Sequence, residues 1–169
     1  IGGRKAFLMK QYKALIFDLC DTIMPYRNDR KPEAIIRGEK IYTTTPLLYD
    51  CFRADHTGIP YLEFYDHFIS ATESVVDLRA SGYEVLGAVR FDLFLDRLKI
   101  SPSNHRSTLH QNLLDIHLKQ VADCLICPQK NRDLLIQLKE EYSIGLITNF
   151  DDTDTVYSIL HRENIHGIF

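Results

Sequence analysis

Two polar residues, Asp18 and Thr148, each stand at the end of a short apolar run and could do chemistry there. A carboxylate such as that of Asp18 can attack a phosphoryl group as a nucleophile and form an acyl phosphate. It can also hold a hard cation, because Mg²⁺ prefers one or two carboxylates together with phosphate oxygens. A hydroxyl such as that of Thr148, with the backbone N–H groups that follow it, can hold the oxygens of the transferring group. Position alone leaves open a second interpretation, in which Asp18 caps a turn and Thr148 and Asn149 are ordinary strand-end residues.

The apolar runs before these residues predict two strands of a parallel sheet. Residues 13–19 (KALIFDL) and 143–148 (SIGLIT) are short, apolar and followed at once by polar residues. This is typical of strands that are buried on both faces. Ligands of open parallel sheets bind outside the carboxyl ends of the strands. Asp18 and Thr148 therefore face one crevice if the two strands are neighbours.

Helical periodicity fills most of the chain between and after these strands. Apolar side chains recur at helical spacing in residues 61–78, 91–98 and 113–121, and Ser101-Pro102-Ser103 is a start signal for the last of these. Two further helices are predicted at residues 131–142 and 151–162, and residues 165–169 are interpreted as the approach to a third strand. Strands separated by helices imply right-handed crossovers in an α/β fold with a parallel sheet.

Composition and charge exclude several classes of function. The chain has 169 residues, is 45% hydrophobic and 25% charged, and has a net charge of −3, which predicts a soluble globular protein. Nothing in this charge indicates a nucleic-acid or acidic-membrane partner, and the densest basic patch, residues 27–31, is interpreted as a solvated loop. No apolar run approaches the roughly 20 residues that a membrane span needs. Residues 1–11 lack the apolar stretch and cleavage site of a signal peptide.

The four cysteines, Cys20, Cys51, Cys124 and Cys127, are unevenly spaced in a chain long enough to bury a core. They are therefore expected to be free thiols in a reducing compartment, the cytoplasm. Cys124 and Cys127 have C-x-x-C spacing, but no second pair or nearby His completes a zinc site. A redox pair usually opens a helix after a strand, whereas this pair follows a predicted helix and precedes Pro128. We favour a structural role for it over metal or redox use.

The run 17–23 (FDLCDTI) resembles motif I of the haloacid dehalogenase-like (HAD) superfamily, hydrophobic-D-x-D-x-T-hydrophobic. Residues 146–149 (LITN) resemble its motif II, a strand that ends in Thr or Ser, and residues 128–142 resemble the proline-led helix before that motif. Members carry a helical cap between the two motifs. The resemblance implies a parallel-sheet, Rossmann-like core formed by residues 1–27 and 125–169, with residues 28–124 inserted as a helical cap.

The resemblance also implies a role for each matching residue. Asp18 would be the nucleophile and a magnesium ligand, and the backbone carbonyl of Cys20 would be a second magnesium ligand. Thr22 would support the loop, and Thr148 with Asn149 would bind the phosphoryl oxygens. The cap would close over the site, exclude water and select the substrate. The implied activity is a Mg²⁺-dependent phosphatase of a small phosphorylated metabolite, working through an aspartyl phosphate.

Cys20 departs from the family pattern, because the second aspartate of motif I, the general acid and base of phosphatases, should stand there. A thiol with an ordinary pKa of about 8.5 is a poor replacement for a carboxylic acid. The loss of a general acid typically lowers the rate by about 10²- to 10⁴-fold. Asp21 is adjacent, but successive residues cannot occupy the same place, and the family commonly has Gly at that position.

The family's motif III lysine and motif IV acidic pair are expected beyond the strand near Ile165, and the sequence ends at Phe169. We therefore expect the core to be incomplete in this chain. Asp151, Asp152 and Asp154 are interpreted as the acidic start of a helix, where carboxylates complement the helix dipole. Three alternatives remain. The first is an inactive binding or scaffold protein of the same fold, and the second is a dehalogenase acting through an ester on Asp18. The third is an unrelated parallel α/β domain, for instance a receiver-like one, with Asp18 as a phosphate acceptor.

Overall fold

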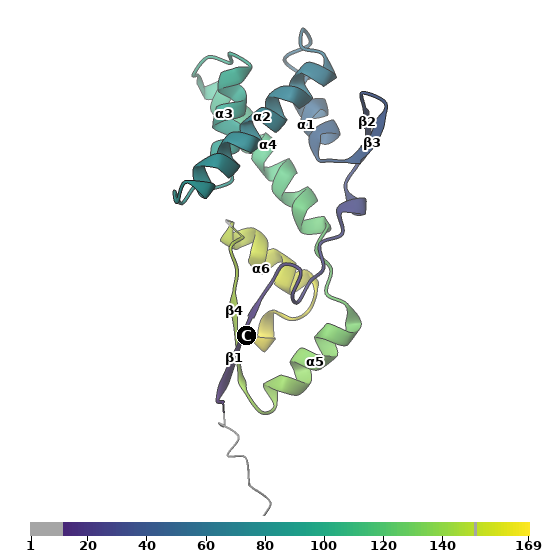
Figure 1. Ribbon diagram of the computed structural model, residues 1–169, viewed down its shortest axis with the longest axis vertical. Helices are drawn as coiled ribbons and strands as arrows, with labels where there is room; N and C mark the ends of the chain where they lie inside the picture. The colour runs from purple at the N-terminus through teal and green to yellow at the C-terminus, as the bar shows by residue number, and fades with distance from the viewer. Residues whose placement is uncertain (1–11, 151) are drawn as a thin grey trace, which may run out of the picture.

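The computed structural model describes residues 12–150 and 152–169, so the predicted lack of a signal peptide in residues 1–11 lies outside the described residues. The described chain has two parts that lie one above the other along the long axis of the molecule (Figure 1). The lower part holds a parallel pair of strands, and the upper part is formed mainly by helices. We keep the predicted boundaries and call residues 28–124 the cap and the other described residues the core.

Two short parallel strands lie at the centre of the core. Strand β1 (Ala14–Asp18) pairs with β4 (Ser143–Ile147) in a register that places Asp18 opposite Ile147. Two helices flank β4 in sequence, α5 (Gln129–Lys139) before it and α6 (Thr153–Arg162) after it. The prediction that the two apolar runs form neighbouring parallel strands is confirmed. The fold is an α/β fold with a Rossmann-like core and a helical cap.

One face of this sheet is covered and the other is open. Leu15 and Phe17 of β1 pack on a hydrophobic cluster to which both α5 and α6 contribute. Ile16 and Ile147 lie on the opposite face, and they are 72% and 66% exposed. Burial on both faces was therefore a wrong prediction for the described residues. The physical reason is that α5 and α6 pack against the same face.

A short 3-10 helix replaces the predicted approach to a third strand. This element, η2 (His166–Ile168), follows Ile165, and both Ile165 and Ile168 are buried in the core cluster. Side chains three residues apart share a face in a 3-10 helix, whereas a strand would place them on opposite faces. The strand prediction is wrong for residues 165–169 because this spacing suits a helical turn.

Four helices form most of the cap, α1 (Thr45–Phe52), α2 (Tyr61–Ala80), α3 (Val89–Arg97) and α4 (Asn104–Asp123). They bury a second hydrophobic cluster, in which the rings of Phe64 and Phe94 meet edge to face with 4.8 Å between centroids. Ser103 caps α4 by accepting a hydrogen bond from the N–H of Arg106. The three helices predicted here from periodicity are confirmed. None of the described helices is long and apolar enough to cross a membrane.

A hairpin that the sequence did not predict lies at the start of the cap. After a 3-10 turn, η1 (Asn28–Arg30), strand β2 (Glu33–Ile36) pairs antiparallel with β3 (Glu39–Tyr42). The two residues between the strands, Arg37 and Gly38, have φ angles of +51° and +86°. Two-residue hairpin turns need this left-handed geometry, which Asn-Gly or Asp-Gly usually signals. The Arg-Gly pair is a weaker sequence signal for such a turn. The cap therefore consists of helices and this one hairpin.

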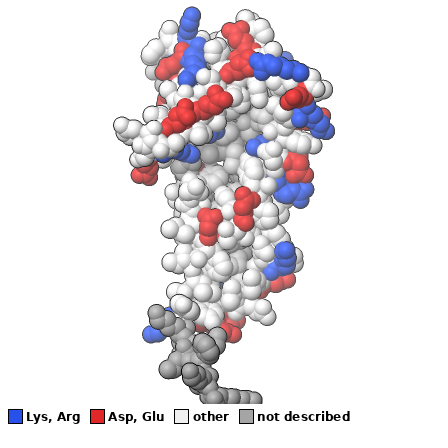
Figure 2. All heavy atoms as spheres, viewed as in Figure 1, with Lys and Arg blue, Asp and Glu red and all other residues white. Residues whose placement is uncertain are grey.

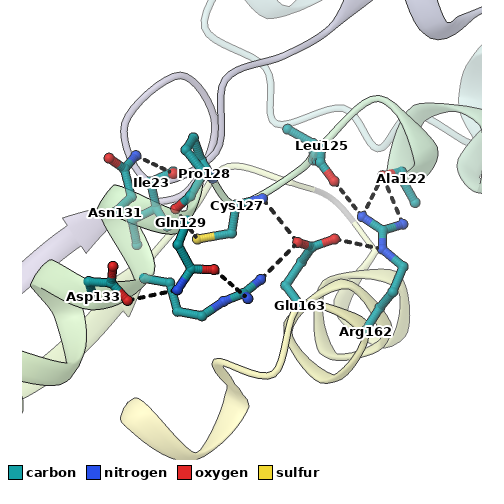
Figure 3. Close-up of polar contacts among 11 residues, drawn as sticks. Ile23, Ala122, Leu125, Cys127, Pro128, Gln129, Asn131, Asp133, Arg162 and Glu163 are labelled. Carbon is teal, nitrogen blue, oxygen red and sulfur yellow. Dashed lines mark hydrogen bonds and ion pairs between the residues drawn. The ribbon is translucent and has the colours of Figure 1, made fainter.

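A cluster of polar contacts joins the end of the cap to the core (Figure 3). Glu163 follows α6, is 8% exposed, and accepts a hydrogen bond from the backbone N–H of Cys127 at 3.1 Å. Its carboxylate also lies 2.9 Å from Arg162 Nε and 3.6 Å from Arg132 Nη2. The Arg162 guanidinium in turn donates to the backbone carbonyl of Ala122 near the end of α4. These contacts fix the segment through which the cap returns to the core.

A Glu163→Leu substitution is expected to destabilise the fold, because it leaves the Cys127 N–H and two guanidinium groups without their shared acceptor. Fully buried pairs lose about 3–5 kcal/mol when one partner is removed. We expect about 2–3 kcal/mol here, because Arg162 and Arg132 are 38% and 26% exposed and solvent screens them. Urea denaturation measures the free energy of unfolding. The control is Glu73→Leu at an exposed position of α2, for which a change within about 0.5 kcal/mol is expected. Equal losses in both variants would contradict the prediction.

Candidate active site

Asp18 and Thr148 lie at the same edge of the sheet. Asp18 is the last residue of β1 and is opposite Ile147, which Thr148 directly follows. The N–H of Phe150 donates to Thr148 Oγ1 at 3.2 Å, so the hydroxyl oxygen orders the loop while its proton can still be donated to a ligand. The structure thus places both residues at the carboxyl ends of neighbouring strands, where ligands of parallel sheets bind.

The loop after β1 forms one tight turn that holds Asp18. The N–H groups of Ile23 and Met24 both donate to the carbonyl of Leu19, at 3.1 and 3.0 Å, and Leu19 and Met24 are fully buried. Thr22 Oγ1 makes a long hydrogen bond of 3.5 Å to Asp18 Oδ2, which restrains the carboxylate from across the turn. The role of Thr22 in supporting the loop stays a prediction.

Cys20 lies in this turn, close to the carboxylates of Asp18 and Asp21. Burial raises the pKa of the Cys20 thiol, and the negative charges of Asp18 and Asp21 raise it further. The thiol is therefore protonated at neutral pH and is a weaker acid than an ordinary cysteine. In the described part of the chain, none of the backbone hydrogen bonds that close the turn uses the carbonyl oxygen of Cys20.

Asp21 holds the chain as it leaves the turn. Its φ angle is +57°, in the left-handed region that favours glycine but that Asp tolerates. Asp21 Oδ1 accepts a hydrogen bond from the N–H of Tyr26 at 2.9 Å. The backbone geometry explains why glycine suits this position. The carboxylate is engaged with the backbone of Tyr26. It therefore does not replace the carboxylic acid that the family pattern has at position 20.

The oxygen donors at this edge are of the kind that Mg²⁺ prefers. Asp18 offers one carboxylate, and Cys20 offers its backbone carbonyl oxygen. In proteins Mg²⁺ commonly keeps several waters and is held by one or two carboxylates plus substrate phosphates. Among the described residues, no group of three or more His, Cys, Asp or Glu side chains is placed to hold a metal ion.

The cysteines of the C-x-x-C pair are buried free thiols. Cys124 Sγ donates to the carbonyl of Gln120 at 3.2 Å, and Cys127 Sγ donates to that of Pro128 at 3.7 Å. Their surroundings support a structural role, as the sequence indicated.

A cavity of about 490 Å³ lies between the cap and the core, and the surface in Figure 2 is hollowed where the two parts meet. Its polar lining comprises Lys31, Arg79, Arg90 and His117 from the cap and Tyr26, Asn149 and Asp152 from the core. A smaller cavity of about 350 Å³ shares Arg79 and Asn149 with it and adds Thr148. The linings of these two cavities include the predicted residues Thr148 and Asn149, but not Asp18, Cys20 or Thr22.

The cap residues of this cavity were not identified from the sequence. Lys31 belongs to the basic patch 27–31 that was interpreted as a solvated loop. That interpretation suits Arg27, which is exposed and lies 2.8 Å from Asp29. It is wrong for Lys31, which is half-buried in the cavity with Nζ 4.9 Å from the centre of the Tyr26 ring. The only sequence signal for Lys31 was its place in the basic patch.

No protein-family model and no curated protein matches this chain at a significant level. Among solved structures, the chain is similar to the HAD-hydrolase YfnB from Bacillus subtilis, whose crystal structure contains bound magnesium. The TM-score is 0.52 and the sequence identity is 17%, and the match covers 95% of this chain and 63% of YfnB. The similarity shows a HAD-like fold, and the chain spans less than two thirds of the length of YfnB.

Proposed function

We propose that this chain belongs to a magnesium-dependent phosphatase that hydrolyses a small phosphorylated metabolite through an aspartyl phosphate on Asp18. The observation that carries the proposal is that Asp18 and Thr148 end neighbouring strands at the edge that faces the cap. The magnesium bound to YfnB supports the choice of cofactor. The four free thiols support a cytoplasmic location, because a reducing compartment keeps cysteines unpaired.

The reaction has two steps. In the first, a carboxylate oxygen of Asp18 forms a bond to phosphorus while the bond between phosphorus and the leaving oxygen breaks. The leaving oxygen keeps the electron pair and takes a proton from solvent water, and the Thr148 hydroxyl donates to a phosphoryl oxygen. In the second, water bonds to phosphorus and the bond to Asp18 breaks, which yields inorganic phosphate and the free carboxylate. A bound Mg²⁺ would supply positive charge that offsets the charge of the phosphoryl oxygens.

Cys20 limits the first step, because its thiol has a raised pKa and gives up its proton poorly. An aryl phosphate such as p-nitrophenyl phosphate needs little help from an acid, since its leaving group is stable as an anion. It is therefore the substrate with which the proposed activity is best detected.

Chelation with EDTA is expected to lower p-nitrophenyl phosphate turnover by the full chain by roughly 10²-fold, because the charge of the phosphoryl oxygens is then no longer offset. Added Mg²⁺ should restore turnover. Ca²⁺ should restore it poorly, because it prefers more ligands at longer distances. Release of p-nitrophenol measures the rate, and circular dichroism checks that EDTA leaves the fold intact. Turnover that is the same with and without EDTA would contradict magnesium dependence, and no turnover at all would favour a binding protein of this fold.

A further inference from the structure

The lining of the larger cavity is rich in positive charge. Lys31, Arg79 and Arg90 contribute to it, whereas Asp152 is the one carboxylate among its described lining residues. Asp152 has a structural task, because its Oδ2 accepts a hydrogen bond from the N–H of Thr155 at 2.7 Å and so caps α6. A concave site lined mainly by one sign of charge concentrates ions of the opposite sign. The cavity is therefore suited to a ligand with more negative charge than positive.

Arg90 is held in a defined orientation on α3. Its Nη1 donates to His117 Nε2 at 2.8 Å, which requires the ring proton of His117 to lie on Nδ1. Nδ1 can then donate to the oxygen of Thr44, which is 3.0 Å away and almost fully buried. The Arg90 guanidinium carbon also lies 5.8 Å from the centre of the Phe68 ring. A charged side chain that is already held in one orientation loses little conformational freedom when it binds a ligand.

Lys31 places a second charge near that of Arg90. Its Nζ donates to Asn28 Oδ1 at 2.8 Å and lies over the Tyr26 ring. Burial lowers the pKa of Lys31, and the positive charge of Arg90 contributes to the lowering. The two cations are thus close enough to affect each other, and an anion bound between them would relieve their repulsion.

We infer that Lys31 and Arg90 bind a second anionic group of the substrate, so that the substrate class is phosphomonoesters that carry a carboxylate or another phosphate at their far end. Arg79 also lines the smaller cavity, together with Glu84 and Thr148, which places it beside the loop proposed to hold the transferred phosphoryl group. Cations near both groups match a molecule with an anionic group at each end. This inference rests on the proposed function and adds the substrate class to it.

Three benzylphosphonates that differ only in the para substituent test this inference without turnover. One carries a carboxylate, one a phosphonomethyl group and one a neutral carboxamide, and calorimetry measures their binding to the full chain with Mg²⁺. We expect the better anionic probe to bind roughly 10- to 100-fold more tightly than the carboxamide, the range for hydrogen bonds to charged groups. A tighter carboxylate assigns the site to carboxylates, and a tighter phosphonomethyl probe assigns it to a second phosphate.

Arg90→Met and Lys31→Met are each expected to bring the affinity ratio between anionic and neutral probes close to one. Lys31 lies in a loop outside any helix or strand, so its variant tests the site even if Arg90→Met fails to fold. Arg53→Met and Lys119→Met remove exposed cations outside the cavity, and both should keep the wild-type ratio. Equal affinities for all three probes, or no binding of any, would overturn the inference. Selective binding without turnover of p-nitrophenyl phosphate would support the anion site while the proposed function fails.

Discussion

An Asp18→Asn variant is expected to hydrolyse p-nitrophenyl phosphate about 10⁴- to 10⁶-fold more slowly than the unchanged protein, the scale of loss when an enzyme loses its nucleophile. An amide of the same shape keeps an oxygen for the hydrogen bond from Thr22, 3.5 Å away in the present structure. It cannot form the acyl phosphate, because its oxygen carries no negative charge. The loss should therefore appear in kcat with an intact fold. Steady-state kinetics and circular dichroism measure the two properties.

Asp21→Asn is the matched control, since it makes the same change in the same turn. The amide oxygen can still accept the hydrogen bond from the N–H of Tyr26, which Asp21 Oδ1 accepts at 2.9 Å. We expect less than about a 10-fold change in turnover, because surface substitutions of this kind usually change little. If Asp18→Asn is as active as Asp21→Asn, the carboxylate of Asp18 is not the nucleophile.

The parts of the site that follow from local sequence were predictable. A short apolar run that ends in a polar residue marks a strand, so β1 and β4 and the positions of Asp18 and Thr148 could be placed. The order of helices and strands then predicted the parallel pairing. The resemblance to motif I also identified Cys20 as the residue that departs from the family pattern. Only the structure showed that Asp21 has a positive φ angle and is engaged with Tyr26.

The cap side of the cavity was not predictable because it depends on contacts between distant residues. Arg90, His117 and Thr44 lie on different helices or loops, and their hydrogen bonds join positions 27 and 73 residues apart in sequence. Periodicity places each residue on a helix but does not say which side chains from several helices meet. The open sheet face has a similar cause, because the apolar strands predicted burial but could not show that α5 and α6 pack on one side.

Cys20 links the geometry of the turn to the substrates that the site can process. Burial and two carboxylates raise the pKa of the thiol, which weakens it as a proton donor. The same surroundings would raise the pKa of a carboxylic acid at this position, by burial first and then by the charges of Asp18 and Asp21. Such an acid would stay protonated closer to neutral pH than an exposed aspartate and would be well suited to protonate a leaving group.

A Cys20→Asp variant is therefore expected to hydrolyse an alkyl phosphate such as β-glycerophosphate about 10²- to 10⁴-fold faster than the unchanged protein, the usual contribution of a general acid. Turnover of p-nitrophenyl phosphate should change far less, because its leaving group departs without a proton. The gain on the alkyl phosphate should be present at low pH and should fall as pH rises through the raised pKa of Asp at position 20.

The pH profiles of kcat/KM for both substrates measure this effect, and Cys20→Asn is the control, since it has the shape of Asp without an acidic proton. An equal gain on both substrates, or the same gain in Cys20→Asn, would contradict the account of Cys20 as a poor general acid. A selective gain that falls with rising pH would show that the turn and Asp18 are already arranged for the reaction. The protein would then be limited by one proton donor, and its natural substrate would be one whose leaving group needs little protonation.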